Sequence, residues 1–252
     1  MSIEVKDLTK IYKLKKRQTK KAVDHISFSI PSGEIVGFIG PNGAGKSTTI
    51  KMMTGILIPD DGSVLINGLN YKKNRKQILM NTGVVFGQKS VLCWDIPILD
   101  TLKLFRDMYR VPDAVYKRNM EMFSDILGIE EFIEQPPRLL SLGQRMKADL
   151  AASLIYDPDI LFLDEPTIGI DVLSKERIRN FIQLINKERH TTIILTTHDV
   201  SDIETLCEKM IIIDRGSLIY DGTLPDLKAE YQTTNLEEII KRIYLAGEKN
   251  NA

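Results

Sequence analysis

The stretch that decides the fold reads Gly40, Pro41, Asn42, Gly43, Ala44, Gly45, Lys46, Ser47, Thr48. It matches the phosphate-binding pattern G-x-x-x-x-G-K-[ST], whose glycines let several backbone N–H groups point at one phosphate cluster. Lys46 can reach the β- and γ-phosphates of a bound nucleotide, and the Ser47 hydroxyl can bind Mg²⁺. All nine residues are therefore candidates for binding a nucleoside triphosphate.

The sequence on either side of this loop supplies the setting that the pattern requires. Glu34–Ile39 is an apolar run that predicts a buried strand, and Thr48–Met53 predicts the first turns of a helix. A loop between a strand and a helix places bound phosphates at the helix N-terminus, where the helix dipole is positive. Because a chance glycine turn would lack this order, we interpret the stretch as a phosphate site.

The composition is that of an ordinary folded protein. Of the 252 residues, 43% are hydrophobic and 27% are charged, and 34 basic residues balance 34 acidic ones. This balance argues against a nucleic-acid partner. Residues 10–21 are a local exception, with seven basic and no acidic side chains; they predict either a solvated loop or a contact with anionic lipid or phosphate.

Two further features bear on the compartment. The cysteines, Cys93 and Cys207, are too far apart in sequence to suggest a disulfide framework, which favours a reducing compartment. Residues 1–4 open no secretory signal, and no apolar run approaches the ~18 residues that a membrane helix needs. If the protein works at a membrane, we expect it to do so through a partner.

Hydrophobic periodicity predicts an α/β protein in three stretches. Residues 3–5, 26–30 and 64–66 predict the strands of a small antiparallel sheet beside the phosphate loop. Residues 98–156 hold apolar side chains at helical spacing and no convincing strand, so they predict a helical subdomain. From residue 160 onward apolar strands alternate with helices, which predicts a parallel sheet.

Polar side chains follow three of the predicted parallel strands. The strands at 83–86, 160–163 and 192–195 are followed by Gln88, by Asp164 and Glu165, and by His198. Because ligands of open α/β sheets bind beyond the carboxyl ends of strands, we expect these side chains to share one crevice with the phosphate loop. Asp164 is a candidate Mg²⁺ ligand, and Glu165 can act as general base toward the water that attacks the γ-phosphorus. Gln88 can contact Mg²⁺ or that water, although Gln88 and His198 taken singly are also compatible with structural positions.

Residues 140–144 form a second candidate anion site at the start of a predicted helix. Ser141 is a good N-cap, and Gly143 leaves the first backbone amides uncovered. Ser141, Gly143 and Gln144 are therefore candidate phosphate ligands, although plain helix capping also explains Ser141. Nothing in the sequence indicates that this helix reaches the phosphate bound by its own chain.

Taken together, these motifs resemble the nucleotide-binding subunit of an ATP-binding cassette (ABC) transporter, and the resemblance covers about residues 3–231. Residues 40–48 resemble the Walker A motif, residues 160–165 Walker B with its catalytic glutamate, and residues 141–144 the signature motif. The resemblance implies ATP and Mg²⁺ as cofactors and ATP hydrolysis as the activity. It implies catalytic roles for Lys46, Gln88, Glu165 and His198, and Mg²⁺ binding by Ser47, Gln88 and Asp164.

Single residues extend the resemblance. Gln88 resembles the Q-loop glutamine and His198 the switch histidine of the family. Asp171 belongs to a stretch, 169–171, that resembles the D-loop. Tyr12 lies 34 residues before Lys46, where the family places an aromatic residue that stacks on adenine. Tyr12 and Asp171 are therefore further candidate nucleotide ligands.

The signature stretch departs from the family pattern at one residue. Leu142 stands where the family usually has its first glycine, while Gly143, at the position that approaches the γ-phosphate, is kept. We therefore expect nucleotide binding to survive. Residues 85–94 and 140–152 look most like ATPases of type-2 ABC exporters, the drug and viologen efflux group.

The resemblance implies an α/β fold with a P-loop NTPase core and a mostly parallel sheet. An N-terminal antiparallel β subdomain and an inserted α-helical subdomain complete it. We expect the ABC ATPase domain to span residues 1–232, with the helical subdomain at about 89–157. Residues 233–252 are expected to form a C-terminal helix and a frayed tail, with the tail beginning at residue 247.

The resemblance also implies how such a protein works. Two subunits, expected to form a homodimer, hold two ATP molecules, each between the phosphate loop of one subunit and the signature helix of the other. Binding and hydrolysis close and open the dimer, which drives export through a separate transmembrane permease. That permease is the expected membrane contact, placing the protein peripherally at the cytoplasmic face of the cell membrane. Trp94, Ile96 and Pro97 are candidates for the docking surface, or else belong to the core.

Three other functions are compatible with parts of the sequence. A soluble ABC protein of translation would carry two cassettes in tandem, whereas this chain has one. A chromosome-type member would insert a long coiled coil, but Ser141 follows Lys46 after 95 residues without sustained heptads. A P-loop kinase would leave two features unexplained, namely His198 and the helix that begins after Ser141. We therefore favour the transporter subunit and expect no nucleic-acid partner.

Overall fold

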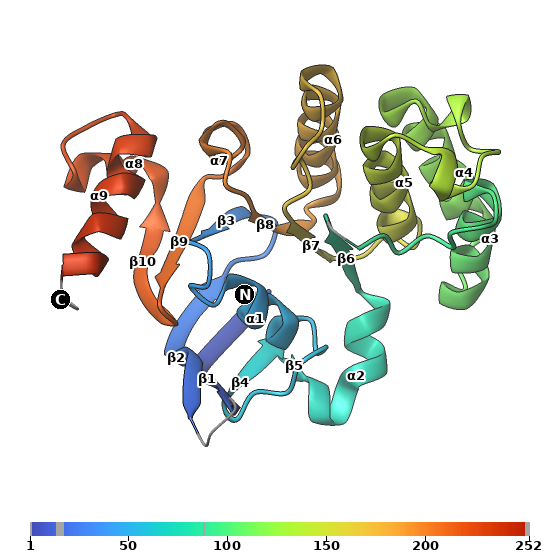
Figure 1. Ribbon diagram of the computed structural model, residues 1–252. Helices are drawn as coiled ribbons and strands as arrows, with labels where there is room; N and C mark the ends of the chain where they lie inside the picture. The colour runs from blue at the N-terminus through green and yellow to red at the C-terminus, as the bar shows by residue number, and fades with distance from the viewer. Residues whose placement is uncertain (1, 14–17, 88, 250–252) are drawn as a thin grey trace.

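A six-stranded sheet forms the centre of the computed structural model, which describes residues 2–13, 18–87 and 89–249 (Figure 1). The strand order is β10-β9-β3-β8-β7-β6, parallel throughout except for β10 at one edge. The strands span Ile35–Ile39 (β3), Thr82–Phe86 (β6), Ile160–Asp164 (β7), Thr192–Thr196 (β8), Lys209–Asp214 (β9) and Ser217–Thr223 (β10). The predicted, mostly parallel sheet is confirmed.

Successive residues of the central strands face two separate hydrophobic cores. In β7, Ile160 and Phe162 pack on the side of helix α1 (Lys46–Met53). Leu161 and Leu163 pack on the opposite side, in the core that includes helices α5 (Leu142–Leu154) and α6 (Val172–Arg189). A strand covered on both faces carries no polar alternation, which explains the continuous apolar runs in the sequence.

A second, antiparallel sheet lies beside α1, with the strand order β2-β1-β4-β5 (Figure 1). Its strands span Ile3–Lys13 (β1), Thr19–Ile30 (β2), Asp61–Ile66 (β4) and Leu69–Asn70 (β5). Helix α2 (Tyr71–Met80) then leads to β6. Residues 10–13 and 19–21 of the basic stretch therefore belong to paired strands, so the prediction of a solvated loop is wrong for them. Residues 14–17 lie outside the described residues.

Helices and short turns occupy the connection from β6 to β7, on the right of Figure 1. They are α3 (Ile98–Tyr109), α4 (Asp113–Met122), a π-helical turn (Phe123–Leu127), two 3₁₀ turns (Ile129–Glu131 and Pro137–Leu139) and α5. Phe123 and Leu127 are fully buried. The Tyr109 ring stacks on that of Tyr156 with centroids 3.7 Å apart, which anchors the end of α3 beside the end of α5.

The C-terminal elements add to the hydrophobic core that includes α5 and α6. Helices α7 (Val200–Leu206), α8 (Leu224–Glu230) and α9 (Leu236–Lys249) follow the last strands, and α9 contacts α7. The sequence predicted fraying from residue 247, but α9 continues to Lys249, because one glycine near a helix end costs only about 1 kcal/mol. Among the described helices, none combines the length and apolar content that crossing a bilayer requires.

Candidate active site

The phosphate loop joins β3 to α1 through glycines that the backbone path requires. Gly45 has φ +108° and Gly43 has φ +81°, a region that favours glycine. A Cβ at Gly45 would overlap the Ala22 carbonyl oxygen of β2, and one at Gly40 would overlap the Ile213 carbonyl oxygen of β9. The loop is thus pressed between the two sheets, and this packing keeps it in shape.

Lys46 places a buried positive charge inside this loop. The residue is 7% exposed, and its Nζ donates to the carbonyl oxygens of Gly40 (2.6 Å) and Pro41 (3.2 Å). Burial lowers the pKa of the ammonium group, and the carboxylates of Glu165 and Asp164 partly offset that effect. A desolvated ammonium surrounded by backbone groups interacts strongly with an anion such as a phosphate.

A recess of about 250 Å³ opens over the loop. It is lined by Tyr12, Lys20, Ala22, Pro41, Asn42, Gly43, Gly45, Lys46, Ser47, Thr48 and Glu165. Sites that enclose a small ligand usually measure about 300–1,000 Å³, so this recess supplies only part of an enclosure for a nucleotide. Tyr12, on β1, keeps 39% of its surface exposed, which leaves its ring available for stacking.

The acidic pair at the end of β7 is held by Thr196 of the neighbouring strand β8. Asp164 Oδ1 accepts a hydrogen bond from Thr196 Oγ1 at 2.6 Å, and the Glu165 N–H donates to the carbonyl and hydroxyl oxygens of Thr196, both at 3.0 Å. Glu165 has φ +56°, a conformation that costs a non-glycine residue about 1–3 kcal/mol. In this conformation Glu165 lines the recess over Lys46.

His198 lies directly beside Glu165. His198 Nε2 is 3.1 Å from Glu165 Oε1, and the two side chains are 46% and 22% exposed. Glu165 follows β7, and His198 follows β8, its neighbour in the sheet. The parallel register of these strands therefore brings together an acid and an imidazole that are 33 residues apart in the sequence.

Sequence reasoning missed Gly87, which follows β6. Its N–H donates to the Asp164 carbonyl oxygen at 2.7 Å, and a Cβ there would lie 2.5 Å from the Glu165 carbonyl oxygen. The chain after β6 can pass this close to the acidic turn only because the residue is glycine. Gln88, predicted to contact Mg²⁺ or the attacking water, lies outside the described residues.

The start of α5 carries the second group of candidate ligands. Ser141 and Gln144 form a capping box, in which the Gln144 N–H donates to Ser141 Oγ (3.2 Å) and the Ser141 N–H donates to Gln144 Oε1 (3.0 Å). Ser141 is exposed. The sequence predicted that Gly143 leaves this helix end open, but Gly143 is buried, and a Cβ there would lie 3.0 Å from Ser174 Oγ of α6.

Residues 169–171 pack beside this helix start. Leu142, the departure from the family pattern, lies against Gly169, where an added Cβ would be 3.1 Å from Leu142 Cδ2. Asp171 caps α6, and the hydrogen bond from the Ser174 N–H lowers the pKa of Asp171. Among the described residues that line the recess over Lys46, none comes from 141–144 or 169–171. Within one chain, the candidate nucleotide ligands thus form two separate groups.

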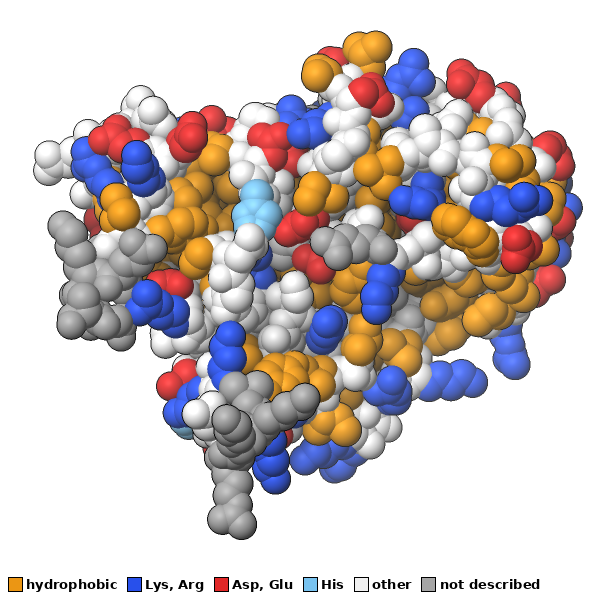
Figure 2. Space-filling model, in the orientation of Figure 1, with side chains coloured by type: hydrophobic (Ala, Val, Ile, Leu, Met, Phe, Trp, Pro, Cys, Tyr) orange, Lys and Arg blue, Asp and Glu red, His pale blue; other side chains and the backbone are white. Residues whose placement is uncertain are grey.

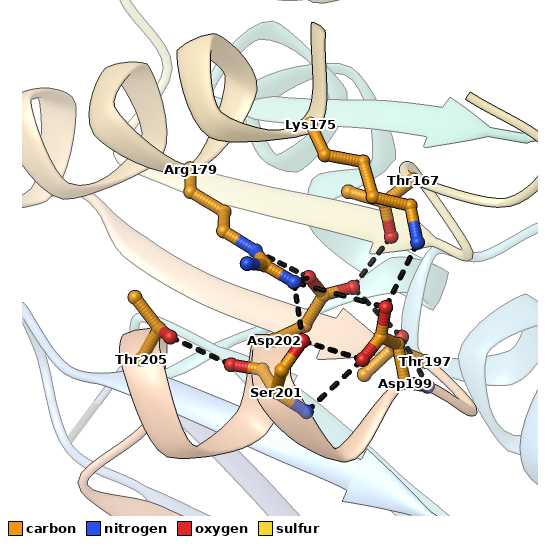
Figure 3. Close-up of polar contacts among 8 residues, drawn as sticks. All are labelled: Thr167, Lys175, Arg179, Thr197, Asp199, Ser201, Asp202 and Thr205. Carbon is orange, nitrogen blue, oxygen red and sulfur yellow. Dashed lines mark hydrogen bonds and ion pairs between the residues drawn. The ribbon is translucent and has the colours of Figure 1, made fainter. Parts of the chain in front are cut away.

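A buried polar network, not indicated by the sequence, surrounds Asp202 of α7 (Figure 3). Asp202 is 0% exposed and accepts hydrogen bonds from Thr167 Oγ1 (2.5 Å), Thr197 Oγ1 (3.0 Å) and Arg179 Nε (2.6 Å). Arg179, on α6, also forms an ion pair with it. Because Asp202 looks like an exposed residue of a short helix, only the packing of α6 on α7 reveals this role.

The network braces the chain on both sides of the Glu165–His198 pair. Thr167 follows Glu165 by two residues, and Thr197 directly precedes His198. Beside them, Lys175 Nζ donates to Asp199 Oδ2 at 2.8 Å, and this bond lowers the pKa of Asp199 to about 2 (Figure 3). The acid and the imidazole are therefore oriented by a common set of buried contacts.

Basic and apolar side chains are both exposed on the surface. Basic side chains gather along the lower edge of the face shown in Figure 2. On α2, the exposed basic residues are Lys72, Lys73, Arg75 and Lys76. Trp94 and Ile96 are 50% and 38% exposed, so the alternative that they belong to the core is wrong. Pro97 is half-buried.

Comparisons with known proteins agree on one family. A family model described as ABC transporter matches residues 23–168. The chain is 37% identical over 230 residues to the probable multidrug ABC transporter ATP-binding protein YbhF of Escherichia coli (strain K12), covering 90% of this chain but 38% of YbhF. It is 32% identical over 232 residues to the ABC transporter ATP-binding protein NatA of Bacillus subtilis (strain 168), covering 92% of this chain and 94% of NatA. A dimeric, post-hydrolysis structure of the ATP-binding cassette MJ0796 with ADP and Pi matches with a TM-score of 0.78 at 25% identity, covering 88% of this chain and 98% of that one.

Proposed function

Because the chain belongs to the ABC transporter family, we propose that it is the ATP-binding and ATP-hydrolysing subunit of an ABC exporter. The observation that carries this proposal is the pairing of Glu165 with His198, 3.1 Å apart, with Glu165 lining the recess over Lys46. The relatives YbhF and NatA are named as transporter ATP-binding proteins, which supports this function over a role in translation or on chromosomes.

ATP binds over the phosphate loop in this proposal. The backbone N–H groups of residues 40–48 and the positive end of α1 hold the phosphates. Lys46 exchanges its hydrogen bonds to Gly40 and Pro41 for the β- and γ-phosphate oxygens, which compensate its charge better than two carbonyl oxygens do. Tyr12 stacks on the adenine.

The residues beside the loop also fit Mg²⁺. The exposed Ser47 hydroxyl and the Asp164 carboxylate are hard oxygen donors, and Thr196 holds the carboxylate in place. Mg²⁺ is usually bound by one or two carboxylates together with substrate phosphate oxygens and water, and these two donors would supply the protein's share of such a site. When bound, the ion neutralises charge on the phosphates. Gln88 is the third proposed ligand.

Glu165 is the proposed general base. With its proton on Nε2, His198 donates to Glu165 Oε1 and thereby orients the carboxylate. The second carboxylate oxygen then accepts a proton from the water that attacks the γ-phosphorus. The strained backbone of Glu165 and its bonds to Thr196 limit the positions that the carboxylate can take.

The second group of ligands requires a second subunit. We assign Ser141, Gly143, Gln144 and Asp171 to the nucleotide bound by the partner subunit, because they do not line the recess of their own chain. ATP then bridges two copies of the chain, and hydrolysis weakens the bridge by removing the γ-phosphate. The resulting opening and closing is a population shift driven by differential affinity.

A separate transmembrane permease is the proposed mechanical partner. The exposed side chains of Trp94 and Ile96, together with Pro97, are its proposed docking surface, on the chain that connects β6 to α3. The subunit would then sit peripherally at the cytoplasmic face of the membrane. In this proposal residues 1–232 form the ATPase domain, residues 89–157 its helical subdomain, and residues 233–252 a C-terminal appendage.

Glu165→Gln tests the proposal, because it keeps the shape of the side chain and removes the base. We expect turnover to fall at least about 100-fold, while the Kd for ATP changes less than about threefold. Glu176→Gln, at an exposed position on α6, is the matched control and should leave both quantities unchanged. Normal ATP hydrolysis by Glu165→Gln would overturn the assignment of the base.

A further inference from the structure

Asp149 is a buried acid that the proposed reaction leaves without a role. It lies on α5, about two turns after Ser141, and is 3% exposed. Burial raises the pKa of its carboxyl to about 6, so the charged form is unfavourable where it stands. An apolar side chain would occupy such a position at lower cost, so the reason for a carboxylate lies in its contacts.

Those contacts hold residues 90–92, which lie between β6 and α3. Asp149 Oδ1 accepts hydrogen bonds from Ser90 Oγ (2.8 Å) and from the Val91 N–H (2.9 Å). Ser90 Oγ in turn accepts from the Leu92 N–H at 3.2 Å. Three successive residues thus depend on one carboxylate, directly or through Ser90. Val91 and Leu92 also pack against the core that contains α5.

A second contact lies one turn earlier on the same helix. The Arg145 guanidinium lies over the Trp94 ring, 5.8 Å from its centroid. Its positive charge also partly offsets the effect of burial on the pKa of Asp149. Helix α5 therefore holds residues 90–94 at two points. Just before them in the chain, Gly87 is bonded to the Asp164 carbonyl.

We propose that Asp149 is a positioning residue that makes residues 90–94 move as one body with α5. A displacement imposed on exposed Trp94 then reaches Ser141, because both are attached to the same continuous helix. In the reverse direction, closure of the dimer around Ser141 moves Trp94. This inference rests on the proposed function, which makes Trp94 part of the permease-facing surface and Ser141 a ligand of the partner's ATP.

Two serine substitutions separate this link from the general stability of α5. Ser90→Ala removes the hydroxyl that joins Asp149 to Leu92. Ser153→Ala removes a hydroxyl of α5 that donates to the Val84 carbonyl of β6 at 3.1 Å, a contact that does not involve residues 90–94. We expect Ser90→Ala to lower kcat at least fivefold with little change in the Kd for ATP, and Ser153→Ala to change kcat less than twofold. Each assay is run where urea unfolding shows the variant to be folded.

Two substitutions of Asp149 test the hydrogen bonds themselves. Asp149→Asn keeps an acceptor oxygen for Ser90 and Val91 and should keep kcat within about twofold of the unsubstituted protein. Asp149→Leu keeps the branched shape of the side chain but removes both acceptor oxygens, and should lower kcat at least tenfold while ATP still binds normally to the loop around Lys46. Both substitutions keep a side chain of similar shape at position 149, but only asparagine keeps an acceptor oxygen. A difference in kcat between the two variants therefore reports the hydrogen bonds to Ser90 and Val91.

The possible outcomes distinguish failure of the positioning role from failure of the proposed function. Equal losses of kcat in Ser90→Ala and Ser153→Ala would overturn the positioning role, and so would an Asp149→Asn variant as impaired as Asp149→Leu. If Asp149→Leu does not fold, the serine pair still gives the decision. Absence of ATP binding and hydrolysis in the unsubstituted protein would instead refute the proposed function, so the two failures are distinguishable.

Discussion

The two groups of candidate nucleotide ligands are built in contrasting ways. The loop half, which comprises residues 40–48 with Asp164, Glu165 and His198, surrounds a recess and has its charges buried or paired within the chain. The signature half, which comprises residues 141–144 and Asp171, consists of two helix starts whose caps are satisfied locally. The first half is prepared to receive an anion, whereas the second is stable without one.

This contrast extends to the backbone. In the loop half, Gly45 and Glu165 both have positive φ, and Lys46 is desolvated. In the signature half, Ser141 and Gln144 form a capping box, a low-energy arrangement worth about 1 kcal/mol. In the proposed dimer, the strained loop half would hold the nucleotide, and the signature half, whose caps are already satisfied, would join or leave it without losing its own hydrogen bonds.

The largest expected effect is on ATP binding and comes from a substitution that disturbs only the loop half. Gly45→Ala forces a Cβ onto the Ala22 carbonyl, whereas Gly43→Ala meets nothing within 4 Å although both positions have positive φ. We expect the Kd for ATP to rise at least about 100-fold for Gly45→Ala and less than about tenfold for Gly43→Ala, because only the first adds a collision to the cost of the left-handed backbone. Titration with a fluorescent ATP analogue measures both. Equal losses would show that backbone strain alone shapes the loop.

The next largest effect is on turnover and comes from a substitution that disturbs only the signature half. Ser141→Arg places a long cation at the start of α5 and removes the cap, so we expect turnover to fall at least about 30-fold while the isolated subunit still binds ATP. Lys46→Ala should also be inactive, because it removes the phosphate-binding lysine from the loop half and leaves the signature half intact. Mixing the two variants re-creates one intact composite site and should restore measurable turnover. A mixture that stays inactive would contradict a site shared between chains.

A smaller effect is expected in the buried polar network around Asp202, which holds the chain next to Glu165 and His198 in the loop half. Asp202→Leu leaves the Arg179 guanidinium without its buried partner and removes the acceptor for Thr167 and Thr197. Breaking a fully buried ion pair costs about 3–5 kcal/mol, and because the Arg179 side chain keeps 20% exposure we expect about 2 kcal/mol of lost unfolding free energy. Urea unfolding checks this value. Adding Arg179→Met should recover part of the loss; a double variant that is no more stable than Asp202→Leu would argue against the unpaired charge as its cause.

The smallest effect concerns pH and belongs to the helix of the signature half. Burial raises the pKa of Asp149 from 3.8 to about 6, so between about pH 4 and pH 6 the native state binds a proton more tightly than the unfolded state. The contribution of Asp149 to stability is therefore lost as the pH rises through this window. We expect Asp149→Asn to gain roughly 1–2 kcal/mol of unfolding free energy relative to the unsubstituted protein between pH 4.5 and pH 7. A difference that is independent of pH would place the pKa of Asp149 near its ordinary value.

Much of this architecture follows from local signals in the sequence. The apolar run 160–163 becomes a strand buried on both faces, the strands that follow it alternate with helices as predicted, and Ser141 caps α5 as expected. Each depends on residues within a few positions of one another, for which periodicity and capping rules hold. The glycine loop is equally local, since its pattern needs only a strand before it and a helix after it.

The features that the sequence did not reveal depend on distant segments. Gly87 has a role only because β6 lies beside β7, and Asp202 is buried only because α6 packs on α7. Asp149 likewise acquires its partners because residues 90–92 cross α5. A short acidic side chain on a helix reads as solvent-exposed until the neighbouring element is in place, so no local rule identifies these contacts.

The sequence by itself determined the chemistry of this protein: a glycine loop with Lys46 and Ser47, an acidic pair after a buried strand, and a capped helix start at Ser141. These depend on residue type and short-range spacing, which a linear chain records directly. The sequence predicted that Glu165 and His198 share one crevice, but only the tertiary structure showed that their side chains lie 3.1 Å apart and that Ser141 does not line the recess over Lys46. Distances between segments far apart in sequence are set by sheet register and helix packing, and these arise only when the whole chain has folded.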